Sequence, residues 1–168
     1  RRGQLDETLI VFASDHGSHF RTRNLEYKRS AHDASIRIPL ILAGPGFRGG
    51  ERRSDLATNL DLLPTLVTVA GGADPERDGR SLQSASGAPE DVLVQISESH
   101  IGRALRTHTH TYAARAPTKH PIAGHLRPAA ERYVGTHLFD NITDPHQRRN
   151  LINDPASSAL RDTLAVRL

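Results

Sequence analysis

Two kinds of hydrophobic pattern divide the chain. The first part carries continuous apolar runs at residues 9–13 and 38–43, and such runs are typical of strands that are buried on both faces of a sheet. After residue 90 the apolar segments are shorter and alternate imperfectly with polar residues, which indicates a small antiparallel sheet. These shorter segments are residues 92–96, 101–107, 111–114 and 133–139.

Helical spacing appears in two places. Residues 61–70 predict a helix with Asp61 as its N-cap, Pro64 in its first turn and a glycine pair as its end. We expect the apolar face of this helix to pack on the sheet. That face consists of Leu62, Leu63, Leu66, Val67 and Ala70. Residues 156–168 predict a terminal helix capped by Asp154 or Asn153.

A linker rich in Gly, Ser, Pro and Ala at residues 83–90 separates the two patterns. We therefore predict an α/β protein with two domains. Residues 1–86 should form the back part of a mixed sheet with helices. Residues 87–168 should form a small antiparallel α+β subdomain, which is a sheet followed by the terminal helix.

The composition narrows the classes of partner. The 168 residues contain no run of 18 apolar positions, so no membrane span is expected. The net charge of +3 and the ten histidines suit an anionic substrate, and a solvated basic surface explains them equally well. We expect no nucleic-acid partner. The absence of cysteine excludes a disulfide framework.

Asp15-His16-Gly17 follows the first apolar run directly. Ligands of α/β sheets bind outside the carboxyl ends of the strands, so a carboxylate and an imidazole at this position could form half of a divalent metal site. The alternative interpretation of the triplet alone is an ordinary Asx-type turn.

A long polar loop at residues 15–35 follows, and loops of this length inside compact domains are usually functional or disordered. Lys28 lies thirteen residues after Asp15, Arg37 nine residues after Lys28, and Pro39 eleven residues after Lys28.

This ordered series resembles the second half of the catalytic domain of type I sulfatases, which belong to the alkaline-phosphatase-like superfamily. The resemblance continues through Leu138-Phe139-Asp140, Asp144-Pro145 and Asn150-Leu151. It implies an alkaline-phosphatase-like fold and a sulfuric ester hydrolase that uses Ca²⁺ or another divalent metal such as Mg²⁺. Asp15 and His16 would be metal ligands. Lys28 would be catalytic and bind the sulfate. His32 would either face the substrate or cap Asp33.

The resemblance also implies parts that this sequence lacks. The family's nucleophile is a formylglycine made from a Cys/Ser-X-Pro-X-Arg motif, and neither this motif nor the acidic pair that completes the metal shell is present. We therefore expect the chain to be the C-terminal portion of a longer sulfatase whose N-terminal part supplies the nucleophile. The portion alone should be inactive. Members of the family are often exported.

Three classes of function follow. The leading one is a sulfatase that acts on a sulfated small molecule or glycan. The second is a phosphatase or phosphonate hydrolase of the same superfamily, against which the spacing from Lys28 to Arg37 argues. The third is a non-catalytic protein that binds sulfated glycans.

Overall fold

The computed structural model describes residues 3–47, 49–73, 78–83, 87–117 and 127–168. The chain forms two compact units, and each unit is assembled from two separate stretches of sequence. The first unit contains residues 1–15 and 38–90, and the second contains residues 16–37 and 91–168. The polar loop that carries Lys28 therefore belongs to the same unit as the C-terminal sheet. The domain boundary predicted from the sequence, between residues 86 and 87, places the loop and that sheet in different domains.

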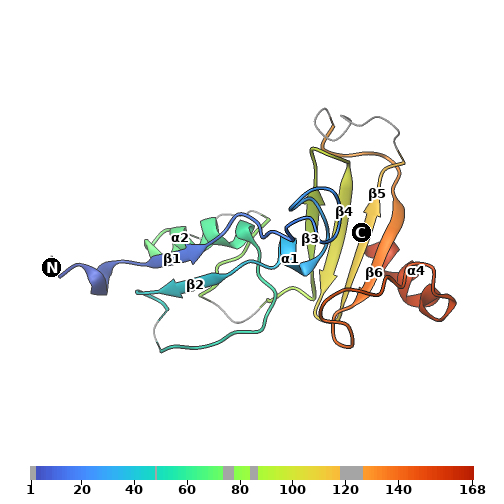
Figure 1. Ribbon diagram of the computed structural model, residues 1–168. Helices are drawn as coiled ribbons and strands as arrows, with labels where there is room; N and C mark the ends of the chain where they lie inside the picture. Colours follow the sequence, from blue (N-terminus) through green and yellow to red (C-terminus); the bar gives the residue numbers. More distant parts are fainter. Residues whose placement is uncertain (1–2, 48, 74–77, 84–86, 118–126) are drawn as a thin grey trace. The chain divides into compact units, whose positions relative to one another are not determined.

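The first unit begins with a 3₁₀ turn, η1 (Leu5–Glu7), and a two-stranded sheet. Strands β1 (Ile10–Ala13) and β2 (Leu40–Ala43) pair antiparallel, with Ile10 opposite Ala43 (Figure 1). The expected burial of both faces is wrong for this pair, because Phe12 is 60% exposed and Ile41 is 59% exposed. A two-stranded ribbon has no second layer of its own to cover its faces.

The predicted helix at residues 61–70 is confirmed as α2 (Leu62–Val69), which follows the 3₁₀ turn η2 (Asn59–Asp61). A capping box opens η2: Thr58 is its N-cap residue, and the Asp61 carboxylate accepts from the amide of Thr58 at 2.8 Å. The same carboxylate accepts from the amide of Arg80 at 2.9 Å. Asp61 is the N-cap residue of α2, as predicted, but its side chain makes no cap hydrogen bond to that helix. The helix ends before Gly71, whose φ of 82° places it in the left-handed region.

The buried face of α2 differs from the predicted one. Leu63 is 49% exposed and Leu66 is 47% exposed, whereas Pro64 and Thr65 are buried. The Thr65 hydroxyl donates to the Asp61 carbonyl at 2.6 Å and accepts from the amide of Leu82 at 2.9 Å. These bonds turn the polar side of the helix toward residues 78–82, so the leucines remain at the surface of the unit.

The second unit is built on a four-stranded antiparallel sheet in the order β3-β4-β5-β6. The strands confirm the four segments predicted from alternation. They are β3 (Asp91–Ile96), β4 (Gly102–Thr107), β5 (His110–Arg115) and β6 (Val134–Asp140). The connection between β4 and β5 is a tight turn at residues 108–109, whereas β5 and β6 are joined by residues 116–133.

Both faces of this sheet are covered. On one face Leu105, Tyr112 and Leu138 pack against Leu164 of the terminal helix α4 (Ser158–Arg167). On the other face Ala31 of the polar loop packs against a second apolar cluster, formed by Ile96, Ala104 and Ala113. The short helix α1 (Asp33–Ile36) ends this loop and lies beside the sheet in Figure 1.

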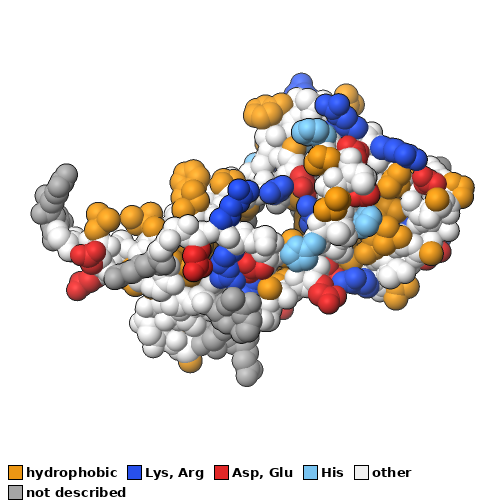
Figure 2. All heavy atoms as spheres, turned by 90° about the horizontal axis from the view of Figure 1, so that it is seen from below, with side chains coloured by type: hydrophobic (Ala, Val, Ile, Leu, Met, Phe, Trp, Pro, Cys, Tyr) orange, Lys and Arg blue, Asp and Glu red, His pale blue; other side chains and the backbone are white. Residues whose placement is uncertain are grey.

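The terminal helix begins after the 3₁₀ turn η3 (Pro155–Ser157). The predicted cap is confirmed, because the Asp154 carboxylate accepts a hydrogen bond from the amide of Ala156 at 3.0 Å. Within the described residues no helix is long and apolar enough to cross a membrane. On the face shown in Figure 2, Lys and Arg side chains lie among Asp and Glu side chains.

Candidate functional site

The structure brings together two of the residues that the sequence selected, His16 and Lys28. The Lys28 ammonium nitrogen lies 2.8 Å from Nε2 of the His16 ring, and Nδ1 of that ring lies 2.8 Å from the Gly17 carbonyl oxygen. An ammonium group can only donate and a carbonyl can only accept. Nε2 therefore accepts from Lys28, and Nδ1 carries the ring hydrogen that is donated to Gly17. Both ring nitrogens are thus oriented by the protein.

Gly17 is required by a close approach of two segments. Its amide donates to the Ser35 carbonyl at 2.8 Å, and a Cβ at this position would overlap the carbonyl oxygen of Ala34. Any side chain would push the backbone away from α1. The beginning of the polar loop is therefore held directly against its end.

Backbone hydrogen bonds also fix Lys28. The amide of His19 donates to the Tyr27 carbonyl at 2.8 Å, and the amide of Ser30 donates to the Lys28 carbonyl at 2.8 Å. The ammonium lies 5.7 Å from the centroid of the Tyr27 ring. Lys28 itself is half-buried. The backbone around Lys28 and its contact with His16 therefore restrain the position of the ammonium group.

Asp15 is exposed and closes the first unit, and His16 opens the second. The backbone carbonyl of Asp15 accepts a hydrogen bond from the Asn59 amide group at 3.2 Å, and its carboxylate lies 3.5 Å from the Ser14 hydroxyl. Asn59 is the first residue of η2, so the turn that precedes α2 contacts the backbone just after β1, where the Asp-His-Gly triplet begins.

The donor atoms of Asp15 and His16 suit part of a metal shell. A carboxylate is a hard oxygen ligand of the kind that calcium and magnesium prefer, and an imidazole nitrogen is softer. On His16 the ligating nitrogen would be Nε2, since Nδ1 donates to Gly17, and in this structure the Nε2 lone pair accepts from Lys28. Among the described residues no group of three or more His, Asp or Glu side chains could hold a metal ion. The two residues fit a metal that takes its other ligands elsewhere.

His32 lies in a different environment from Lys28. Its side chain is 8% exposed, and its ring centroid is 5.0 Å from that of Phe139 and 5.7 Å from that of His137. Nδ1 lies 3.1 Å from the Ser30 hydroxyl, and His32 makes no side-chain cap to α1. Burial, with the nearby Arg23 as a second cause, lowers the pKa of His32 to about 4, so its ring is neutral at pH 7.

His19 joins the same ring cluster, with its centroid 6.4 Å from that of His32. It is 2% exposed, and neither ring nitrogen has a hydrogen-bond partner. Burial lowers the pKa of His19 and that of His137. These three histidines belong to the packing between the polar loop and the sheet, a role that a single sequence does not distinguish from a solvated loop.

Sequence analysis missed three residues that hold the loop on the sheet: Asp33, Arg106 and Gln147. The Arg106 guanidinium contacts both oxygens of the Asp33 carboxylate, and the Gln147 side chain bonds the Asp33 backbone amide at 2.6 Å. Arg103 and Arg106 are three residues apart on β4, so their side chains lie on opposite faces of the sheet. The Arg103 guanidinium accordingly lies away from Asp33, 4.7 Å from the centroid of the Tyr133 ring.

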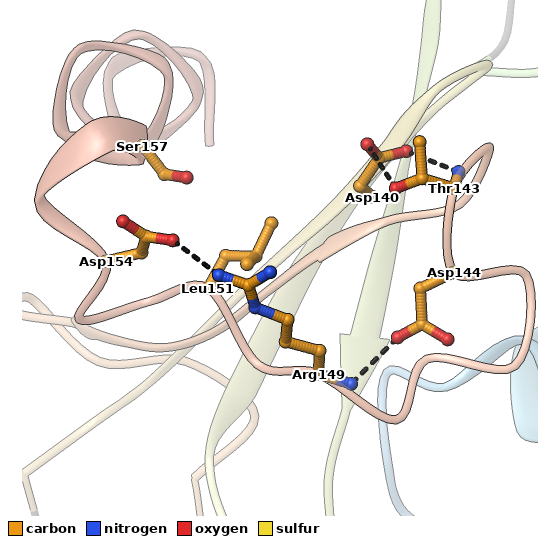
Figure 3. A pocket seen from close by; sticks show the side chains of 7 residues that line it. All are labelled: Asp140, Thr143, Asp144, Arg149, Leu151, Asp154 and Ser157. Atoms are coloured by element: carbon orange, nitrogen blue, oxygen red, sulfur yellow. Dashed lines mark hydrogen bonds and ion pairs between the residues drawn. The ribbon is translucent and has the colours of Figure 1, made fainter.

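An acidic pocket lies elsewhere in the second unit, beside α4 (Figure 3). Its carboxylates serve the local backbone: Asp140 accepts from the amide of Thr143 at 3.1 Å, and Asp144 accepts from the amide of Arg149 at 2.8 Å. These backbone hydrogen bonds lower the pKa of both carboxyl groups. The pocket is therefore formed by turn-capping residues.

Comparison with known proteins connects this geometry to a family. The family model described as "Sulfatase" matches residues 1–73. The choline-sulfatase of Rhizobium meliloti is 32% identical over 175 residues, which cover 99% of this chain and 31% of that protein. The chain therefore spans about a third of the length of this relative.

Solved structures show the same fold. A protein solved in complex with its substrate D-glucosamine-2-N,6-O-disulfate superposes with a TM-score of 0.79 at 21% identity, covering 99% of this chain and 34% of that one. A phosphonate monoester hydrolase from Silicibacter pomeroyi superposes with a TM-score of 0.76 at 24% identity, covering 98% of this chain and 34% of that one. These matches show that residues 1–73 belong to the sulfatase family and that the chain as a whole has the fold of the solved structures.

Proposed function

We propose that this chain is the C-terminal portion of a sulfuric ester hydrolase, in which Lys28 binds the sulfate group of the substrate. The observation that carries the proposal is the pairing of Lys28 with His16, two residues that were selected by their spacing in the sequence and lie 2.8 Å apart in the structure. The 32% identity to a choline-sulfatase supports the same reaction class.

The chemistry of sulfate ester hydrolysis explains the need for a fixed ammonium. Negative charge grows on the bridging oxygen as the sulfur–oxygen bond breaks, and a preorganised cation stabilises that charge without having to reorganise. Lys28 supplies a compact charge with three hydrogen-bond donors. One donor is used by His16, so the remaining two are available for sulfate oxygens without breaking the pair.

We assign Asp15 and His16 as ligands of a divalent metal, Ca²⁺ or Mg²⁺. Such an ion would supply a further positive charge near the sulfate oxygens. Nε2 of His16 has one lone pair, which in this structure accepts from Lys28. A metal on Nε2 would therefore require the Lys28 ammonium to turn away from His16, which leaves all three of its donors for the substrate.

The remaining machinery would come from an N-terminal part of the same protein, which would carry a formylglycine nucleophile and the other metal ligands. The substrate would be a sulfated small molecule or a glycan, and one structural neighbour was solved with a disulfated glucosamine. His32, the second residue proposed for substrate binding, is 8% exposed, so a direct contact with sulfate would require the surrounding rings to separate.

The test is hydrolysis by the full-length protein that contains this chain. We expect it to release sulfate from an aryl sulfate or a sulfated sugar, and we expect the 168-residue chain alone to show no turnover and weak calcium binding by calorimetry. Two protein ligands cannot complete a shell of six to eight oxygens. Turnover by the isolated chain would contradict the proposal. Sulfate-ester binding without turnover by the full-length protein would instead favour a non-catalytic glycan-binding protein.

A phosphonate hydrolase is the second candidate, favoured by the structural likeness to a phosphonate monoester hydrolase. The same full-length preparation should be given a sulfate monoester and a phosphonate monoester that share one leaving group. A higher kcat/KM for the sulfate ester supports the leading proposal, and a higher kcat/KM for the phosphonate supports the alternative.

A further inference from the structure

We propose that Arg106 and Gln147, which lie on the C-terminal sheet and the turn after it, are positioning residues for the Lys28–His16 pair. The proposal rests on the sulfatase reaction proposed above, and it extends that reaction to residues far from Lys28 in the sequence. It follows from an unbroken series of contacts between the sheet and the polar loop, all within the second unit.

The first contact is a fork between a guanidinium and a carboxylate. Nε of Arg106 on β4 lies 3.0 Å from Oδ1 of Asp33, and Nη2 lies 3.2 Å from Oδ2. The two side chains are only 15% and 17% exposed. Bidentate geometry and partial burial make this pair stronger and more directional than a surface ion pair. It fixes the first residue of α1 on the sheet.

The second contact is the Gln147 side chain, which is 3% exposed. Its Oε1 accepts from the backbone amide of Asp33 at 2.6 Å, and its Nε2 donates to the side-chain oxygen Oδ1 of Asn141 at 2.8 Å. The backbone carbonyl of Gln147 also accepts from the Arg23 guanidinium at 3.2 Å. One residue therefore holds the polar loop at two points, and its own φ of 51° is an uncommon backbone conformation for a residue other than glycine.

The contacts continue from α1 to the proposed site. The Ser35 carbonyl of α1 accepts from the amide of Gly17 at 2.8 Å, and Gly17 can lie there only because it has no side chain. Gly17 accepts from the ring of its neighbour His16, which in turn accepts from Lys28. Displacement of α1 would therefore move the ring that orients the Lys28 ammonium.

A double-mutant cycle in the full-length protein tests this relation. We expect Arg106→Gln to lower kcat/KM by about 10- to 100-fold, because a displacement of about 1 Å at a reacting group has effects of this size. In a Lys28→Ala background the same substitution should cost less than about threefold, since the residue it positions is already absent. Gln147→Ala should behave in the same way. Arg103→Gln is the matched control on the other face of β4 and should leave kcat/KM within about twofold in both backgrounds.

Hydrogen exchange separates this proposal from the proposed reaction. In the Arg106→Gln variant the amide of Gly17 should exchange faster, whereas in Arg103→Gln it should not. Faster exchange at Gly17 in a protein that hydrolyses no sulfate ester would retain the positioning role and refute the sulfatase function. Equal losses of kcat/KM from Arg106→Gln with and without Lys28, or unchanged exchange at Gly17, would overturn the positioning role.

Discussion

The two units of this chain differ in how they treat apolar side chains. In the second unit the central strands are closed on both faces, and Ala104, Leu138 and Phe139 are at most 2% exposed. In the first unit the strand and helix residues of the same character remain at the surface, with Phe12 and Leu60 each about 60% exposed. The second unit therefore completes its own core, whereas the first unit has hydrophobic faces that are suited to further layers.

This difference locates the proposed sulfate-binding residue in the better-packed unit. Lys28 belongs to the second unit because Ala31 and His32 of its loop are buried on the sheet. The exposed apolar faces of the first unit fit the proposal that an N-terminal part of the protein packs on them. The sheet of the second unit would then position Lys28, and the N-terminal part of the protein would supply the nucleophile and the other metal ligands.

The largest stability effect should come from the core of the second unit. Leu138→Ala removes a fully buried side chain and should lower the free energy of unfolding by about 2–5 kcal/mol, whereas Phe12→Ala should change it by less than about 1 kcal/mol in this chain. Urea unfolding followed by far-ultraviolet circular dichroism reports on both units, whereas tyrosine fluorescence reports on the second unit alone, because all three tyrosines lie in it. Similar effects of the two substitutions would contradict the contrast between the units.

The second effect concerns pH. The pKa of His32 is lowered from 6.5 to about 4 in the folded state, so the unfolded chain binds the proton more readily between these values. Stability should be complete above about pH 6.5 and should decrease as the pH falls toward 4, by roughly 3 kcal/mol from His32 alone. The lowered pKa values of His19 and His137 add to the same trend. Urea midpoints measured between pH 4 and pH 8 give this dependence.

Two variants decide whether the buried rings cause it. His32→Phe should make the stability of the second unit depend less on pH, because no proton can be taken up at that position. His108→Gln, at an exposed histidine between β4 and β5, should leave the dependence unchanged. A dependence that is equal in wild type and His32→Phe would mean that other groups dominate.

A smaller effect is expected in the first unit. Asp61→Ala removes the carboxylate that accepts from the backbone amides of Thr58, just before η2, and of Arg80, which should cost about 1–2 kcal/mol locally. Hydrogen exchange of the amides of residues 62–69 should accelerate, while the amides of β4 and β5 should be unaffected. Faster exchange in both units would show that they unfold together. The two units would then differ in the burial of their apolar side chains and not in their stability.

The features that sequence predicted well are those set by local patterns. The strands of the second unit, the terminal helix with its Asp154 cap, and α2 all follow from alternation, helical spacing and capping residues. The burial of β1 and β2 was predicted wrongly. A run of apolar residues indicates a strand, but it does not show whether another layer of the protein covers the faces of that strand. The choice of Lys28 as the sulfate-binding residue came from its spacing to Asp15 and Arg37, and it stays a prediction.

The residues that hold the loop could not be predicted in the same way. Asp33 and Arg106 are 73 residues apart, and Asp33 and Gln147 are 114 residues apart, so no local pattern connects them. His19 and His32 had the composition of a soluble loop, and only the fold shows that they are buried. The pairing of His16 with Lys28 depends on the closure of the loop at Gly17, which is also a property of the folded chain.

The most direct test of the account is the kinetics of Lys28→Ala in the full-length protein. We expect kcat/KM for a sulfate ester to fall by about 10²–10³, comparable to the loss of one preorganised donor, and Lys28→Arg to restore it only in part. Arg21→Ala, at an exposed cation of the same loop, should change it by no more than about threefold. Equal and small losses for Lys28→Ala and Arg21→Ala would contradict the assignment of Lys28 as the sulfate-binding residue.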